Sequence, residues 1–291
     1  MGNDTTVIIP TLGARPRELE RAIASVTSQA HARAIPLVVV NGQRYDVDLV
    51  AGLKRRKDLR CVQLEAAGVS NARLEGRRLV DTPYFAFLDD DDELLPDALE
   101  QRLAAFVETS SDVVVTNGYR ESEHGRQIIF PRFDHHPDDP ARALLEENWL
   151  ASAGGFYRTD KIEPKLLQDL PDYLEMTYLA FLLAHRSQIV RLNQPTFVVH
   201  AGAAEQASES FAYLLSSPDV LQRMQSITSR KDLKSRLGCR RANALHQASE
   251  TALRYRKLGS AWRLHLQSLI VGDGIKYLPY TRHIVLGRSR T

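Results

Sequence analysis

Residues 84–100 read YFAFLDDDDELLPDALE, and this stretch decides how the rest of the chain is interpreted. Tyr84 to Leu88 is a short apolar run typical of a buried strand, and four consecutive aspartates follow it directly. One aspartate is enough to cap a following helix, and Asp92 is placed to do so. Four adjacent carboxylates repel one another unless a cation offsets their charge. Because Mg²⁺ and Mn²⁺ take carboxylate oxygens, we expect Asp89 to Asp92 to hold a divalent cation with positions left open for substrate phosphates.

Short apolar runs and amphipathic helices alternate on both sides of this stretch. The expected strands cover residues 6–10, 35–40, 61–64, 84–88 and 112–116. The expected helices cover residues 16–26, 70–80 and 96–107. Strands that are apolar throughout and alternate with helices indicate an α/β fold, with a mostly parallel, Rossmann-like sheet covered by helices on both faces. Ligands bind such sheets at the carboxyl ends of the strands, so the loops after Pro10, Val40 and Leu88 are the expected site.

Charge is divided unevenly along the chain. The formal net charge is +2, but residues 1–220 hold 23 Lys and Arg against 33 Asp and Glu, while residues 221–291 hold 15 against 3. Near the change in charge the sequence also becomes helical in pattern, with apolar residues at helical spacing. We therefore expect an α/β domain at 1–204 and a basic helical region at 205–291.

The basic region suggests a surface that meets phosphate groups. Its apolar stripe comprises Trp262, Leu266, Leu269 and Ile270, with basic residues nearby. Tryptophan and leucine flanked by lysine and arginine are typical of an interfacial helix, so we expect peripheral membrane contact. Helix packing or oligomer formation through the same stripe is the alternative. We expect no nucleic-acid partner, since no recognised motif or aromatic platform accompanies the charge.

The two cysteines, Cys61 and Cys239, are too few for a disulfide framework and lack the spacing of metal ligands. The first ten residues lack the pattern of a secretory signal, and no apolar window approaches 18 residues. We expect a cytoplasmic protein that is peripheral at the inner face of the cell membrane.

Two segments carry a resemblance to a known family. They are VIIPTLGARPRELERAIASVTSQ, residues 7–29, and GVSNARLEGRRLVDTPYFAFLDDDDELLPDAL, residues 68–99. Both resemble family-2 glycosyltransferases with the GT-A fold, and the likeness covers about residues 5–205. The resemblance implies transfer of a sugar from a nucleotide-diphosphate donor, most commonly a UDP-sugar, to an acceptor hydroxyl with the help of Mg²⁺ or Mn²⁺.

The resemblance also assigns roles to individual residues. It implies donor contacts for Pro10, Thr11, Asn41, Arg73, Asp89 and Asp90. Asp89 and Asp91 match the first and third positions of the Asp-x-Asp metal motif, although Arg73 could instead be a solvated helix charge. Asn41 stands where the family often has an acid, which leaves the base preference of the donor site open.

An inverting transfer needs a carboxylate that removes the acceptor proton. In LPDYLEMTYLAFLLAHRSQIVRL, residues 170–192, Asp172 matches the second acid of the family's acidic pair, and Pro171 replaces the first. The alternative is that Asp172 only caps a helix starting near Tyr173. Glu175 is the substitute base, and Asp169 is a weaker one.

Two further residues resemble family positions. His200 follows a strand expected near residues 196–199 and could bind the metal or diphosphate, or could be a structural histidine. Trp149 could stack on a sugar ring or belong to the core.

We therefore expect a metal-dependent, inverting glycosyltransferase of the hexosyltransferase type. Its acceptor would be a glycan or lipid-linked molecule in cell-surface polysaccharide assembly. A non-catalytic nucleotide-sugar or glycan-binding module on the same fold, and a retaining transferase, are the alternatives.

Overall fold

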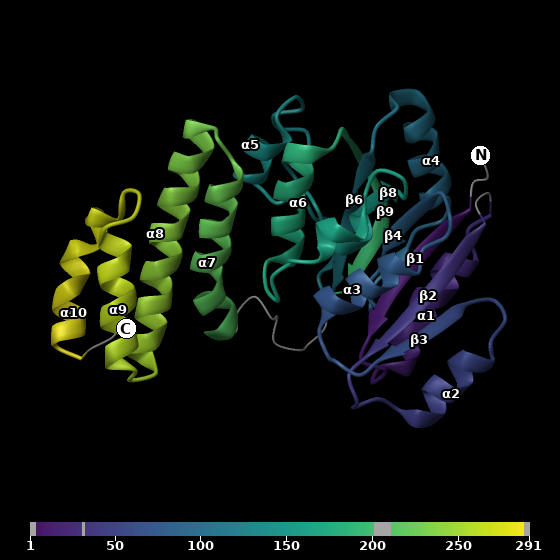
Figure 1. Ribbon diagram of the computed structural model, residues 1–291, viewed down its shortest axis with the longest axis horizontal. Coiled ribbons are helices and arrows are strands. Elements are labelled where there is room, and N and C mark those ends of the chain that lie inside the picture. Colours follow the sequence, from purple (N-terminus) through teal and green to yellow (C-terminus); the bar gives the residue numbers. More distant parts are fainter. Residues whose placement is uncertain (1–3, 31–32, 201–210, 288–291) are drawn as a thin grey trace. The chain divides into compact units, whose positions relative to one another are not determined.

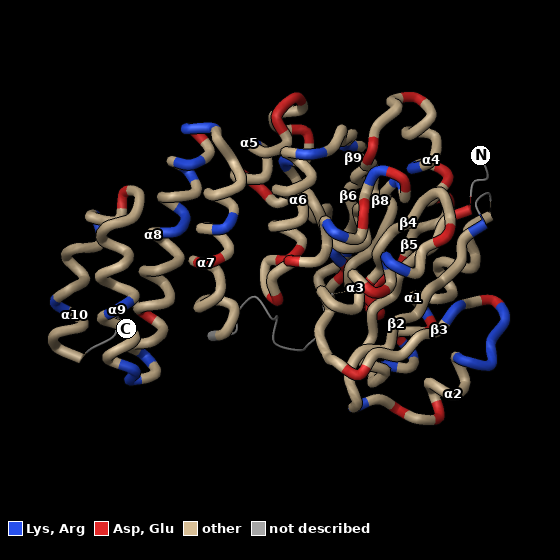
Figure 2. Tube along the Cα trace, in the orientation of Figure 1, with Lys and Arg blue, Asp and Glu red and all other residues tan. Residues whose placement is uncertain are grey.

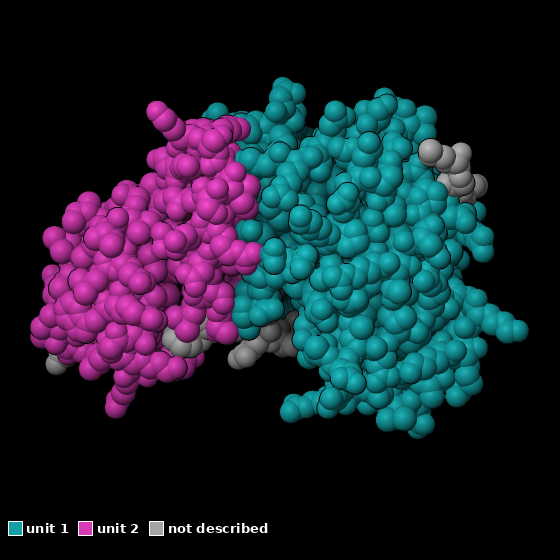
Figure 3. All heavy atoms as spheres, viewed as in Figure 1, with its two compact units in different colours: residues 1–202 teal, residues 203–291 magenta. Residues whose placement is uncertain are grey.

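A computed structural model of the protein describes residues 4–30, 33–200 and 211–287. The chain forms two compact units, Met1–Gly202 and Ala203–Thr291, which are coloured separately in Figure 3. The boundary expected from the sequence, between residues 204 and 205, lies outside the described residues.

The first unit is built around one mixed sheet, in which nine strands are described (Figure 1). They are β1 Thr5–Thr11, β2 Ala34–Asn41, β3 Arg60–Leu64, β4 Tyr84–Phe87, β5 Glu93–Leu94, β6 Val113–Ser122, β7 Gly125–Ile128, β8 Gly155–Arg158 and β9 Ile189–His200. The order is β3-β2-β1-β4-β8-β6-β9-β5, and β7 pairs with β6. β5, β7 and β8 run opposite to the other six strands. The expected α/β fold with a mostly parallel sheet is confirmed.

The sheet departs from a purely parallel pattern at β8, which lies antiparallel between β4 and β6. Strand β8 carries the buried side chains of Phe156 and Tyr157. The ring of Tyr157 stacks on Phe85 of β4 with centroids 4.9 Å apart, so aromatic packing fixes this strand beside β4.

Helices cover both faces of the sheet, as expected. The described α-helices of this unit are α1 Pro16–Thr27, α2 Val47–Arg55, α3 Val69–Arg78, α4 Ala98–Thr109, α5 Pro140–Leu144 and α6 Glu175–Arg186. Val7 and Val38 share a buried cluster with residues of α1, α2 and α4. Their neighbours Ile8 and Val39 point the other way, because side chains alternate along a strand. There Gly76 of α3 lies so close that a Cβ on it would be 2.5 Å from Ile8 Cγ2, which explains the glycine.

The first helices begin and end largely where the sequence indicates. Pro16 starts α1, whose buried residues Leu19, Ala22, Ile23 and Val26 follow helical spacing. The suggestion that Asp92 caps the next helix is wrong. Short strand β5 follows Asp92, and α4 starts only after Asp97, whose side chain makes no capping hydrogen bond.

The second unit is helical, as expected for the C-terminal region. Its described helices are α7 Phe211–Ile227, α8 Lys231–Arg254, α9 Leu258–Leu269 and α10 Thr281–Val285, with a 3₁₀ helix at Gly274–Tyr280. A core that includes Leu245, Ala252, Leu264 and Ile284 joins α8, α9 and α10. None of the described helices combines the length and apolar composition needed to traverse a bilayer.

Candidate active site

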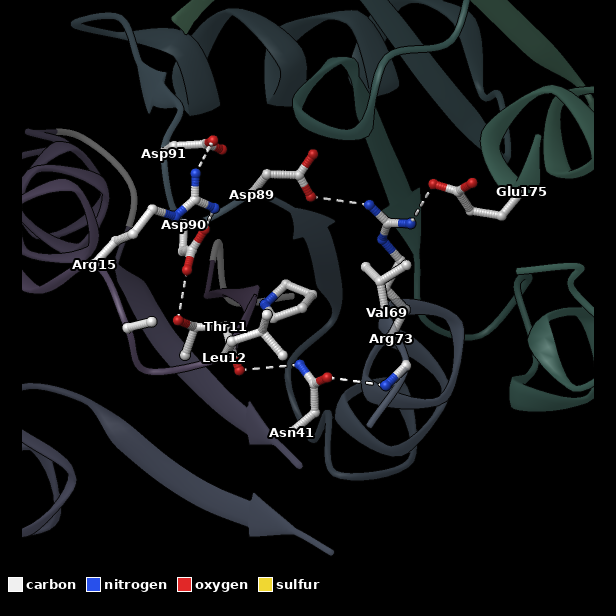
Figure 4. A pocket seen from close by; sticks show the side chains of 13 residues that line it. Thr11, Leu12, Arg15, Asn41, Val69, Arg73, Asp89, Asp90, Asp91 and Glu175 are labelled. Carbon is white, nitrogen blue, oxygen red and sulfur yellow. Dashed lines mark hydrogen bonds and ion pairs between the residues drawn. The ribbon is translucent and has the colours of Figure 1, made fainter. Parts of the chain in front are cut away.

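A cavity of about 630 Å³ opens at the carboxyl ends of β1, β2 and β4. Its lining comes from the loop after β1, the end of β2, the start of α3, the aspartates after β4 and the start of α6 (Figure 4). The residues expected at the donor site all line it: Pro10, Thr11, Asn41, Arg73, Asp89 and Asp90, together with Asp91. The rule that ligands bind at the carboxyl ends of parallel strands therefore located the cavity correctly.

Asn41, the last residue of β2, joins three segments of the cavity wall. Its Nδ2 donates to the backbone oxygen of Thr11 at 3.0 Å, and its Oδ1 accepts from the backbone N–H of Gly68 at 3.0 Å. An aspartate could accept the second bond but, when ionised, could not donate the first. The amide therefore makes both of the hydrogen bonds that join the β1, β2 and α3 segments, whereas an aspartate could make one.

Arg73 of α3 is a buried cation that organises the acidic groups of the cavity. Its Nη2 donates to Asp89 Oδ1 at 2.9 Å and to Ser152 Oγ at 3.0 Å, and its Nη1 donates to Glu175 Oε1 at 2.9 Å. Only 2% of its side chain is exposed, so the alternative of a solvated helix charge is wrong. Burial lowers the pKa of Arg73, but the charges of Asp89 and Glu175 outweigh it and the net shift is upward.

A second arginine, Arg15, contacts the aspartates after β4 from the opposite side. It lies in the loop between β1 and α1, and its guanidinium pairs with both Asp90 and Asp91. Thr11 Oγ1 donates to the other carboxylate oxygen of Asp90 at 2.5 Å. Burial raises the pKa of Asp90, an effect that the Thr11 hydrogen bond and the charge of Arg15 partly offset. Arg15 was not predicted as a site residue, although its place in a loop after a strand end was a usable signal.

An aspartate can bind a hard cation through a carboxylate oxygen that these hydrogen bonds do not occupy. Both oxygens of Asp90 accept hydrogen bonds. Between described residues, the bonds to the Asp89 side chain end on Oδ1 and the bond to the Asp91 side chain ends on Oδ2. Asp89 and Asp91 therefore each keep one side-chain oxygen without a partner among the described contacts, and their binding of Mg²⁺ or Mn²⁺ stays a prediction.

Asp92 is buried behind this pair. Burial, followed by the charges of Asp89 and Asp91, raises its pKa to about 8. Its Oδ1 accepts from the backbone N–H of His200 at 3.3 Å. At neutral pH Asp92 is therefore mostly protonated and adds little negative charge to the cluster.

The acids of the segment before α6 differ in position. Asp172 is exposed and does not line the cavity, and Asp169 is also exposed. Helix α6 begins at Glu175 with Leu174 as its N-cap, so the alternative in which Asp172 caps a helix at Tyr173 is wrong. Glu175 does line the cavity and is held by Arg73. Of the three acids considered as the base, Glu175 is therefore the one in the cavity wall.

His200 is not among the residues that line this cavity. Its Nε2 lies 3.0 Å from Glu93 Oε1, and its Nδ1 lies 3.8 Å from Glu121 Oε2, where β5, β9 and β6 meet. The ligand atoms of these three residues lie within 4.8 Å of one another, as in a separate small cation site. A role for His200 beside Asp89 and Asp91 stays a prediction.

Trp149 belongs to the core. Its side chain is buried, and its Nε1 donates to the backbone oxygen of Pro140 at 2.9 Å. The alternative that it stacks on a sugar ring is therefore wrong, and the core interpretation holds.

Comparison with known proteins agrees with this geometry. The model of the family described as "Glycosyl transferase family 2" matches residues 6–166, more than half of the chain. No curated protein matches the chain. The crystal structure of S. aureus TarS 1-349 has a TM-score of 0.59 and 17% identity, covering 81% of this chain and 69% of that chain. The same protein in complex with UDP-GlcNAc has a TM-score of 0.60 and 15% identity, covering 98% and 88%. The resemblance inferred from the sequence is thus confirmed, and the chain belongs to glycosyl transferase family 2 and is a glycosyltransferase.

Proposed function

We propose that this glycosyltransferase moves a sugar from a UDP-sugar to a hydroxyl of a glycan or lipid-linked acceptor. The observation that carries the proposal is the cavity in which Asp89 and Asp91 lie beside Arg15 and Arg73. The carboxylates suit Mg²⁺ or Mn²⁺, and guanidinium groups suit diphosphate oxygens. TarS, which has the same fold, has been solved with UDP-GlcNAc and with UDP, and this supports a uridine nucleotide.

Each part of the cavity would act on a different part of the reaction. A bound divalent cation would neutralise charge that develops on the leaving diphosphate. Asp89 and Asp91 would hold that cation. Arg73 fixes the direction of the Asp89 and Glu175 carboxylates, because it donates to both.

We assign the general base of an inverting reaction to Glu175, in place of Asp172. Glu175 lines the cavity, and Arg73 engages only its Oε1 in the described contacts. The carboxylate is thus oriented while its other oxygen can accept a proton from an acceptor hydroxyl. Asp172, which is exposed outside the lining, would then have no direct part in the chemistry.

The experiment is nucleotide release from a panel of sugar nucleotides, with Mg²⁺, Mn²⁺ or a chelator. We expect release from a UDP-sugar that needs the metal, with a further increase when a suitable acceptor hydroxyl is added. Metal-independent release, or release from no UDP-sugar, would contradict the proposal.

The base assignment has its own test in the same assay. Glu175→Gln should lower kcat by about 10²-fold or more, the usual range for a lost general base, while Asp172→Asn should leave it nearly unchanged. The reverse order would return the role to Asp172. A product with the donor's anomeric configuration would instead identify a retaining enzyme.

We also propose that the second unit binds the inner face of the cell membrane, which would place the site near lipid-linked acceptors of cell-surface polysaccharide assembly. Large apolar side chains are exposed at Leu266, Ile270, Ile275, Leu278, Val285 and Leu286. The same region, residues 254–286, holds the basic residues Arg254, Arg256, Lys257, Arg263, Lys276 and Arg282 against Asp273 as its one acid (Figure 2). Exposed apolar groups with basic neighbours suit an anionic leaflet.

Flotation of the full chain with vesicles tests this attachment. We expect binding to vesicles that contain phosphatidylglycerol and weaker binding to phosphatidylcholine alone. Ile270→Glu should reduce it, whereas Val107→Glu on α4 is a matched control because both side chains are 84% exposed. Equal flotation of the two variants would contradict the proposed surface.

A further inference from the structure

Two arginines form ion pairs with carboxylates of the acidic cluster, and they differ in how firmly they are held. Arg73 is buried and has three side-chain partners from separate segments. In the described part of the chain the polar partners of the Arg15 side chain are Asp90 and Asp91, and 49% of that side chain is exposed. Arg73 is thus a fixed part of the wall, whereas the half-exposed Arg15 can leave the aspartates for water; buried Asp90 would then lose its cation and keep Thr11 as a hydrogen-bond partner.

The two aspartates that Arg15 contacts also differ in the hydrogen-bond partners that they would keep if Arg15 moved away. Asp90 keeps the hydrogen bond from Thr11 Oγ1 at 2.5 Å when Arg15 leaves. The Asp91 side chain has Arg15 as its partner in the described contacts, and its backbone oxygen accepts from Arg21 Nη2 at 2.6 Å. The backbone of Asp91 therefore stays anchored while its carboxylate becomes free for another cation.

A divalent cation at Asp89 and Asp91 would compete with Arg15. The guanidinium occupies one oxygen of Asp91, and two cations crowded onto one carboxylate repel each other. The released side chain would stay at the same cavity, because Arg15 is one of its lining residues. There its fork of N–H donors matches the oxygens of a diphosphate.

We propose that Arg15 is an exchangeable counter-cation of the acidic cluster, which a divalent metal displaces from Asp91 and which then binds the diphosphate of the donor. The proposal rests on the metal and nucleotide binding of the proposed function. It has a consequence that a fixed arginine would lack. Arg15 weakens metal binding when no nucleotide is present and strengthens it when nucleotide is bound, so metal and nucleotide bind cooperatively.

The test is a titration with Mn²⁺, followed by the electron paramagnetic resonance signal of the free ion, without and with UDP. Wild type, Arg15→Gln and Arg17→Gln are compared. Arg17 is the matched control, because it is exposed two residues further along and no bond to it is described. Thermal unfolding of each variant checks that it is folded.

Without UDP, we expect Arg15→Gln to bind Mn²⁺ about five- to tenfold more tightly than wild type and Arg17→Gln, in the usual range of coupling between sites. The increase in Mn²⁺ affinity that UDP produces should shrink in Arg15→Gln by a similar factor. Unchanged or weaker Mn²⁺ binding by folded Arg15→Gln, or an undiminished effect of UDP, would overturn the exchange. Absence of Mn²⁺ binding in every variant would also overturn it.

Failure of this inference can be told apart from failure of the proposed function. Release of UDP from a UDP-sugar by wild type is measured in parallel. If wild type releases UDP in a metal-dependent way while Arg15→Gln binds Mn²⁺ with unchanged affinity, the proposed function stands and only the exchange of Arg15 is contradicted. Lack of release from any UDP-sugar contradicts the function itself.

Discussion

Replacing Arg73 by methionine should destabilise the first unit more than most single substitutions. The change keeps an apolar stem of similar length but removes the cation between Asp89 and Glu175, together with three hydrogen bonds of 2.9–3.0 Å. Breaking a buried ion pair costs about 3–5 kcal/mol. Because the Asp89 side chain is 37% exposed, water can relieve part of that cost, and we expect about 2–4 kcal/mol.

The assay is urea unfolding of wild type and Arg73→Met at neutral pH, supported by thermal unfolding. A double variant, Arg73→Met with Glu175→Gln, removes one of the two carboxylates that lose their cation. It should recover about 1 kcal/mol of the lost free energy of unfolding. The matched control is Arg78→Met, since Arg78 lies on the same helix, is exposed, and has its described ion pair with Glu75 of that helix. A folded Arg73→Met within about 0.5 kcal/mol of wild type would refute the view that Arg73 neutralises a carboxylate pair.

Three other predictions concern the cavity wall and the packing beside it. Asn41→Asp should lower the free energy of unfolding by about 1–2 kcal/mol, because the donor to the Thr11 oxygen is lost, and urea unfolding measures it. Gly76→Ala should cost about 1–3 kcal/mol, since the added Cβ would lie 2.5 Å from Ile8 Cγ2, and an unchanged midpoint would contradict this packing. Asp92 has a pKa of about 8 in the folded state against 3.8 ordinarily, so its contribution to stability is complete below about pH 4 and is lost as the pH rises through 8. Without metal, the free energy of unfolding of Asp92→Asn should therefore fall less between pH 6 and pH 9 than that of wild type. Parallel profiles of unfolding free energy against pH would contradict the raised pKa of Asp92.

Much of the fold could be predicted because its signals are local. An apolar run such as residues 35–40 favours a buried strand by its own composition, and Pro16 marks a helix start without help from distant residues. The acid cluster after β4 and the strand-end rule then located the cavity. By contrast, β8 was not predicted, because its place depends on Tyr157 stacking on Phe85, which is 72 residues earlier in the chain.

The parts of the site that were missed depend on pairing between distant residues. Arg15 and Asp91 are 76 residues apart, and Arg73 and Glu175 are 102 apart, so no local pattern joins them. The proline before Asp172 suggested a helix start there, but Leu174 takes a left-handed conformation and delays α6 to Glu175. That delay places the glutamate, in place of the aspartate, in the cavity wall.

The measurement that tests the central claim most directly is equilibrium binding of UDP, with and without Mn²⁺, to wild type, Asp91→Asn and Asp97→Asn. Asp97 is the matched control, because it is exposed at the N-cap of α4, makes no capping bond and does not line the cavity. We predict that Mn²⁺ tightens UDP binding by about tenfold or more in wild type and Asp97→Asn but has little effect in Asp91→Asn. Equal tightening in all three proteins would contradict a metal-assisted nucleotide site at the carboxyl ends of β1, β2 and β4.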